Sequence, residues 1–207
     1  MRTRQTIDRY MYRQPALTMQ AVGVAADDAP LHENALRWSG VLCRADEPSL
    51  KPPGGSENHR VILPSEVIRK RLGDLIGMPV NVDPEGYTDH LKSHPIGTIL
   101  SAALRGKDVV VSGVLHAKYW PKEVATINAN KNQLCMSYEI GSCAVEDDRA
   151  PVWTLKDFRF QGAAVLLKSA AAYGAKTSIA ASTSRPDCWT PAMRRLRAEG
   201  RRLAEWG

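Results

Sequence analysis

The sequence predicts a mainly β domain with flanking helices, in the α+β class. Apolar, β-branched runs occupy residues 96–104 and 108–116, and only Arg105-Gly106-Lys107 separates them, which is typical of a β-hairpin. Strand-like runs follow at 134–145 and 152–160, while few stretches show helical spacing. With 207 residues, 43% of them hydrophobic, the chain is long enough for one core of ordinary size.

The first part of the chain is predicted to hold little regular structure. Residues 1–37 show no sustained periodicity and are expected to form a flexible N-terminal arm. Residues 38–43 (WSGVLC) are expected to form the first strand. Residues 47–59 are rich in Pro, Gly and Ser, which predicts a long loop.

A helix is expected to follow Pro64, with Ser65 as its candidate cap and Gly77 at its end. A short strand over 79–82 and a turn over 83–86 come next. Pro121 is suited to the first position of a second helix, because that position has no partner for an N–H, and this helix is expected to end near Asn130.

The last part of the chain combines a strand-rich segment with a basic tail. Residues 162–181 are small and apolar and fit either a strand with a packing loop or a helix. Residues 190–205 predict a basic amphipathic helix. The predicted organisation is therefore an arm (1–37), a β domain (38–181) and a basic C-terminal tail (182–207).

The net charge of +6 is concentrated at the two ends of the chain. Residues 1–14 and 185–207 each carry +3, so the body between them is neutral. Basic ends of this kind fit tethering to an acidic partner, and nucleic-acid binding is not expected except through these tails. No apolar run approaches the ~20 residues of a membrane span, and the N-terminus has no apolar signal-peptide core, so neither a membrane nor export is expected.

The four cysteines do not predict a metal site. Cys43, Cys135, Cys143 and Cys188 show no CxxC spacing, whereas structural zinc ligands usually come in close pairs. We expect reduced thiols, and no metal or cofactor.

One group of residues has the chemistry of a serine hydrolase, which needs a nucleophile, a base and a group that orients the base. Ser137 lies in mid-strand, His90 and His94 precede the hairpin, and Asp157 lies on the strand after Ser137. Adjacent strands could therefore bring a base, a nucleophile and an orienting acid together. The G-x-S-x-G, H-E-x-x-H and P-loop motifs are absent, so several other enzyme classes lose their usual support.

The order of these pieces resembles the head maturation (prohead) proteases of tailed phages. The matching motifs span roughly residues 38–181, and they are listed in chain order: Gly77-Met78-Pro79-Val80, Asp89-His90, Ile96-Gly97-Thr98, Gly113-Val114-Leu115, Pro121, Met136-Ser137-Tyr138-Glu139, Gly162-Ala163-Ala164-Val165-Leu166, Ala171-Ala172-Tyr173 and Lys176-Thr177.

The resemblance implies an assemblin-like antiparallel β-barrel ringed by helices, with Ser137 as nucleophile and His90 as general base. The third member of the family's site matches Asp157, with Glu139 as the alternative, and His94 is the alternative base. Arg149, after the serine strand, is the candidate for oxyanion support.

The same resemblance implies partners and a location. The substrates would be the phage scaffold, the N-terminal segment of the major capsid protein and the chain itself, cut inside the assembling procapsid in the host cytoplasm. A homodimer is also implied.

Two other functions remain open from the sequence. One is a non-catalytic, head-associated scaffold or structural protein on the same fold. The other is a nucleic-acid-binding accessory protein that uses its Arg-rich ends, which would bind DNA in a salt-dependent way.

Overall fold

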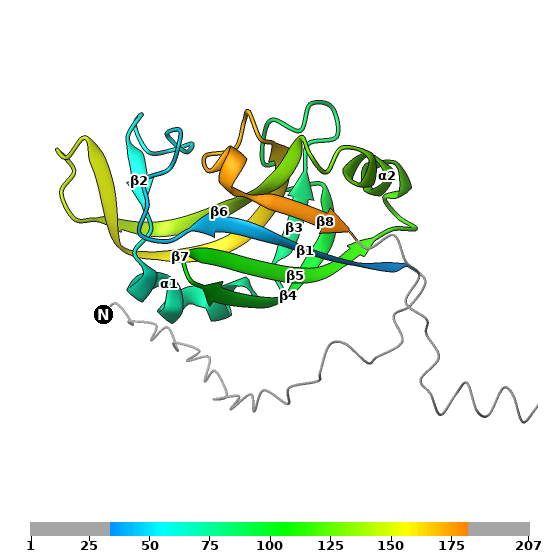
Figure 1. The fold of residues 1–207 in the computed structure, drawn as a ribbon, viewed down its shortest axis with the longest axis horizontal. Coiled ribbons are helices and arrows are strands. Elements are labelled where there is room, and N and C mark those ends of the chain that lie inside the picture. Colours follow the sequence, from blue (N-terminus) through cyan, green and yellow to red (C-terminus); the bar gives the residue numbers. More distant parts are fainter. Residues whose placement is uncertain (1–33, 182–207) are drawn as a thin grey trace, which may run out of the picture.

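The computed structural model describes residues 34–181, which fold into one curled, mainly antiparallel β-sheet with two helices at its margins (Figure 1). The strands are β1 (Ala35–Arg44), β2 (Arg60–Ile62), β3 (Pro79–Val82), β4 (Pro95–Arg105), β5 (Asp108–His116), β6 (Leu134–Val145), β7 (Val152–Leu167) and β8 (Ser178–Ala181). The helical segments are α1 (Ser65–Arg71), α2 (Pro121–Ala129) and the 3₁₀ turns η1 (Leu72–Leu75) and η2 (Gly174–Lys176).

The sheet has eight strands in the order β2-β7-β3-β4-β5-β1-β8, with β6 paired to the other edge of β7. Most neighbours are antiparallel, including the predicted β4–β5 hairpin, in which Arg105 lies opposite Asp108. The exceptions are β2 and β3, which both pair with β7 in parallel. Because β7 is 16 residues long, it reaches β2 with its first residues and β3 with its last ones.

One apolar core lies inside the curl of the sheet, and about two thirds of its buried members come from strands. Its largest fully buried side chains include Leu42, Ile99, Leu115, Phe158 and Phe160. On β5 the burial alternates residue by residue, which is the pattern of a strand with one face on the core. The backbones of β1 and β8 approach closely at Gly40, where a Cβ would lie 2.2 Å from the Ser178 carbonyl oxygen.

The mainly β, α+β prediction is confirmed, with local corrections. β1 begins at Ala35, so residues 35–37 belong to the sheet and not to an arm. The helix after Pro64 continues as a 3₁₀ turn from Leu72, and Gly77 follows with φ +82°. Ser65 is not its side-chain cap; instead the Ser65 N–H donates to Asp46 Oδ1 over 2.8 Å.

The ambiguous stretch 162–181 forms the end of β7, a turn and β8, with no α-helix. The N-terminal arm up to residue 33, the basic tail 182–207 and the helix expected within it lie outside the described residues. Among residues 34–181, no helix is both long and apolar enough to span a bilayer.

Candidate active site

Ser137 lies on the buried half of β6, where it is held in a fixed orientation. It pairs with Ala164 of β7, and only 7% of its surface is exposed. Side chains alternate along a strand, so Ser137 and Glu139 share one face of the sheet while Tyr138 turns to the other. The sequence therefore presents a hydroxyl and a carboxylate side by side, two residues apart.

His90 reaches Ser137 from the loop between β3 and β4. The Tyr87 N–H donates to the Asp83 carbonyl over 2.9 Å, and the Leu167 N–H of β7 donates to the Tyr87 carbonyl over 2.7 Å. Tyr87 adopts a positive φ of 53°, which turns the chain at this point. The His90 N–H donates to Asp89 Oδ1 over 2.7 Å. These bonds tie the loop to β7 and carry the imidazole to the face that bears Ser137.

The imidazole of His90 bridges Ser137 and Glu139. Its Nε2 lies 3.0 Å from Ser137 Oγ and its Nδ1 lies 3.1 Å from Glu139 Oε1. An ionised carboxylate only accepts hydrogen bonds, so the network assigns the proton to Nδ1 and leaves Nε2 to accept the Ser137 hydroxyl proton. This is the arrangement of nucleophile, base and orienting acid that a serine hydrolase requires.

Glu139 is largely buried and stays ionised because of its neighbours. Burial acts to raise the pKa of this carboxyl, but hydrogen bonds from His90 and Asn81, and the charges of His90 and Lys92, outweigh it and lower the pKa below its ordinary value. The Asn81 amide donates to Oε1 over 2.9 Å, and Lys92 Nζ lies 3.8 Å from Oε2. The lowered pKa therefore keeps this carboxyl group ionised at neutral pH.

Ser137, His90 and Glu139 all line a groove of about 600 Å³. The carboxylate, amine and imidazole side chains that line it are Asp89, His90, Lys92 and Glu139, which come from the loop before β4 and from β6 beside Ser137. The rest of the lining is largely apolar and includes Val61, Ile140, Val145, Trp153 and Leu155. The volume and the largely apolar lining suit a bound ligand beside the serine.

The predicted long loop 47–59 forms one wall of the groove through Pro53, Gly54, Gly55 and Ser56. Its far end is fixed by His59, whose ring stacks on Trp153 with centroids 4.5 Å apart and whose Nδ1 lies 3.0 Å from the Ala150 carbonyl oxygen. The loop is therefore ordered on the β6–β7 hairpin.

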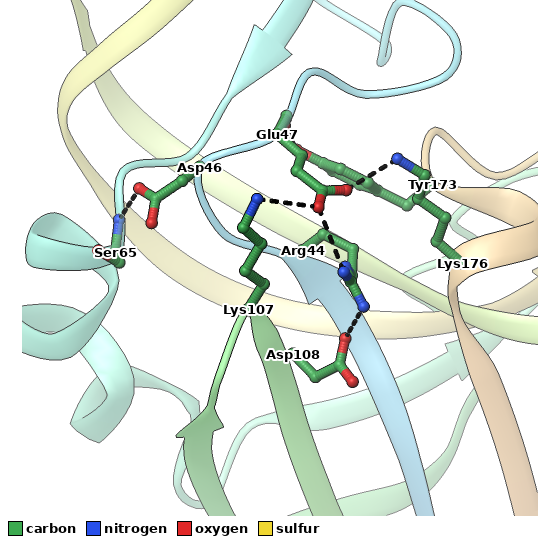
Figure 2. Close-up of polar contacts among 8 residues, drawn as sticks. All are labelled: Arg44, Asp46, Glu47, Ser65, Lys107, Asp108, Tyr173 and Lys176. Carbon is green, nitrogen blue, oxygen red and sulfur yellow. Dashed lines mark hydrogen bonds and ion pairs between the residues drawn. The ribbon is translucent and has the colours of Figure 1, made fainter.

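The near end of the same loop is fixed by a cluster of charges around Glu47 (Figure 2). Its carboxylate contacts Arg44 and Lys107 at 3.2 Å each and Lys176 at 2.8 Å, and the Tyr173 hydroxyl donates to its carbonyl over 3.0 Å. Hydrogen bonds from these cations lower the pKa of Glu47 to about 2. The cluster ties the start of the loop to β1, to the turn between β4 and β5, and to η2.

The structure brings together Ser137, His90 and Glu139 from the residues that the sequence suggested, but it does not bring Asp157 to them. Asp157 pairs in register with Ala144, seven residues along β7 from Ala164, a distance of roughly 20 Å in a strand. Its carboxylate instead accepts hydrogen bonds from two guanidinium nitrogens of Arg71, Nε and Nη2, at 2.6–3.0 Å. Asp157 therefore lies away from Ser137 and His90, and the carboxylate that contacts His90 is that of the alternative, Glu139.

His94 and Arg149 also lie elsewhere. The His94 ring packs on Trp120 with centroids 3.9 Å apart, and its Nε2 lies 3.6 Å from Glu123 Oε1, beyond hydrogen-bond range. Arg149 lies in the turn between β6 and β7, where its N–H donates to Asp147 Oδ1, and it is not among the residues that line the groove. The alternative base and the candidate for oxyanion support thus make no contact with Ser137.

Sequence reasoning missed Asn81, which completes the polar group. A signal was present, because Asn81 is the single polar residue in the short strand Pro79–Val82. Within residues 34–181, no group of three or more His, Cys, Asp or Glu side chains is arranged to hold a metal ion.

Comparisons with known proteins give little beyond the geometry. No family model matches the chain, and no curated protein matches its sequence. Among solved structures, the chain is similar to the capsid assembly protease gp21 of bacteriophage T4, with a TM-score of 0.41 and 14% identity over 68% of this chain and 88% of that one. A similarity of this size establishes neither a shared fold nor a shared activity.

Proposed function

We propose that this chain is a serine endopeptidase that acts in the maturation of a tailed-phage head. The observation that carries the proposal is the continuous line from Ser137 Oγ through His90 to Glu139, with contacts of 3.0 and 3.1 Å. The order of motifs that resembles prohead proteases supports the biological setting, because the residues of this line fall within those motifs.

In the proposed reaction, Ser137 Oγ attacks the carbonyl carbon of a peptide bond while its proton passes to His90 Nε2. The C–N bond then breaks, and His90 returns that proton to the leaving amine, which leaves an acyl group on Ser137. Water attacks the ester, again with His90 as base, and release of the new carboxyl group regenerates the serine. Glu139 stabilises the imidazolium that exists between these transfers.

The oxyanion of each tetrahedral intermediate needs N–H donors. We expect them in the turn after β7 and not at Arg149, because the neighbouring residues Leu166, Ala170 and Ala172 line the groove. The apolar wall of the groove suits an extended peptide with apolar side chains beside the cleaved bond.

The proposed substrates are the scaffold, the N-terminal segment of the major capsid protein and the ends of the chain itself. Cleavage would take place inside the assembling procapsid in the host cytoplasm.

The test is intact mass after overexpression, alone and with the scaffold and capsid proteins of the same phage. Wild type should trim itself and cut the scaffold, and a fluorophosphonate probe should label Ser137. Ser137→Ala should abolish all three while leaving the thermal unfolding midpoint little changed. A Ser137→Ala protein that still cuts, or a folded wild type that neither cuts nor reacts, would favour the non-catalytic head protein instead.

A further inference from the structure

Asn81 occupies a position where an amide side chain has no obvious structural use. It lies on β3 between Val80 and Val82, and all three residues are buried, Asn81 with 1% of its surface exposed. Its Oδ1 has no hydrogen-bond partner among the described residues. An unpaired buried polar atom costs free energy, so a third valine would serve the packing of this strand better.

The sheet register places Asn81 in the same row as the nucleophile. Asn81 pairs with Ala164 of β7, and Ala164 pairs on its other side with Ser137 of β6. Strands lie about 4.8 Å apart, so the β3 and β6 backbones are separated by roughly 10 Å with β7 between them. A contact between side chains of β3 and β6 must therefore cross over β7.

The residues of β7 at this point are small enough to permit the crossing. Ala164 carries a methyl group, and Gly162, which pairs with Glu139, carries no side chain. A Cβ on Gly162 would already lie 3.6 Å from Glu139 Oε2 and 3.3 Å from the Pro79 carbonyl oxygen. The Glu139 carboxylate thus lies over Gly162, where Asn81 Nδ2 reaches Oε1 at 2.9 Å.

We propose that Asn81 is a positioning residue, a fourth member of the line, which holds the Glu139 carboxylate in the orientation and charge state that His90 needs. This inference rests on the proposed peptidase function. The amide donates to Oε1, the same oxygen that accepts from His90 Nδ1. Without this donor the carboxylate loses its fixed rotamer, and the imidazole loses the partner that sets its tautomer.

The first test is steady-state kinetics on a fluorogenic peptide that spans the self-cleavage site. Asn81→Ala should lower kcat by about 10- to 100-fold, the effect of one hydrogen bond to a charged group, and change KM little. Asn81→Ser, which keeps a small polar group, provides the same test if the alanine variant does not fold. Asn130→Ala is the matched control, because Asn130 donates to the Thr126 carbonyl at the end of α2, away from the groove.

The second test is the pH profile of Asn81→Asp, which replaces the donor with a carboxyl group of the same shape. Two adjacent carboxyl groups repel each other when both are charged, so the pair keeps one proton up to a higher pH than an isolated carboxyl group would. While that proton is bound, it gives Glu139 a hydrogen-bond donor again. The activity of this variant relative to wild type should therefore be greatest at acid pH and fall as pH rises. A residue with a merely structural role would leave the shape of the profile unchanged.

The outcomes separate the two proposals. An active wild type with an unchanged kcat in folded Asn81→Ala, or an Asn81→Asp profile parallel to that of wild type, overturns the role of Asn81 alone. A folded wild type that neither cuts the peptide nor reacts with fluorophosphonate overturns the peptidase function and the role of Asn81 with it.

Discussion

Replacing each candidate acid by its amide separates the two assignments of the third member. Glu139→Gln and Asp157→Asn are matched changes, since each removes one negative charge and keeps the size of the side chain. The geometry predicts a large loss of activity for the first variant and almost none for the second.

The size of the expected loss follows from the contact between His90 and Glu139. Nδ1 and Oε1 are 3.1 Å apart, and the Glu139 side chain is 8% exposed. With an effective dielectric constant of about 20, a pair of unit charges at this distance is stabilised by about 5 kcal/mol, and water in the open groove reduces that figure. Losing about 4 kcal/mol of imidazolium stabilisation lowers kcat by about 10³-fold.

Asp157 has no comparable path to the reaction. Its partner is Arg71 on the last turn of α1, and half of its side chain is exposed. The Arg71 guanidinium lowers the pKa of Asp157, so the carboxyl group is charged in this ion pair. The Asp157→Asn variant therefore loses a surface ion pair but no contact with Ser137 or His90. We expect kcat/KM within a factor of about two of wild type.

The assay is hydrolysis of the fluorogenic self-cleavage-site peptide, with active-site titration by fluorophosphonate to correct for the folded fraction. Glu139→Gln should also react more slowly with the fluorophosphonate, since acylation of Ser137 needs the same base. If Asp157→Asn lost as much activity as Glu139→Gln, or if Glu139→Gln kept more than about a tenth of the wild-type kcat, the electrostatic argument would be refuted.

Two further predictions concern stability. In the folded protein the pKa of Glu47 is about 2, against an ordinary value of 4.5, so its contribution to folding stability is present above pH 4.5 and is lost as pH falls toward 2. In urea unfolding, wild type should lose stability across this pH window faster than Glu47→Gln. Equal losses in the two proteins would contradict the prediction. Gly162→Ala places a side chain on a residue with φ +153° and should lower the free energy of unfolding by about 1–3 kcal/mol. Gly73→Ala is the control, because its Cβ would enter open space and should leave the free energy of unfolding unchanged. Equal urea midpoints for the two variants would argue against this account.

The strand pattern was readable from the sequence because it depends on local signals. The β4–β5 hairpin, the Pro-led α2 and the strands β3 and β6 all appear within a residue or two of the expected bounds. Segments whose structure depends on distant partners were not readable. β2 has only three residues and exists because β7 pairs with it, and 162–167 extend β7 because β3 and β6 flank them.

The same distinction between local signals and distant pairing applies to the candidate site. Ser137 and His90 could be named from the order of motifs along the chain, and the structure brings them together. Asp157 was favoured as the acid because the next strand in sequence pairs with the serine strand, which is correct. The pairing register decides which residue faces Ser137, however, and that register depends on the irregularities of the β6–β7 ribbon, which no local pattern reports.

A stricter use of strand periodicity would have favoured Glu139. Residues two apart on a strand share a face, so the Ser137–Glu139 pair needs no assumption about register, whereas Asp157 needs one that places it opposite Ser137. The same reasoning applies to the row of small residues. Gly162 and Ala164 also lie two apart, on β7, and their small size leaves room for a polar group above them. The serine strand carries a hydroxyl and an acid at positions i and i+2, and the neighbouring strand carries glycine and alanine at the same spacing. These small residues leave space on the sheet surface, which a base from a loop and a supporting amide from the next strand can occupy.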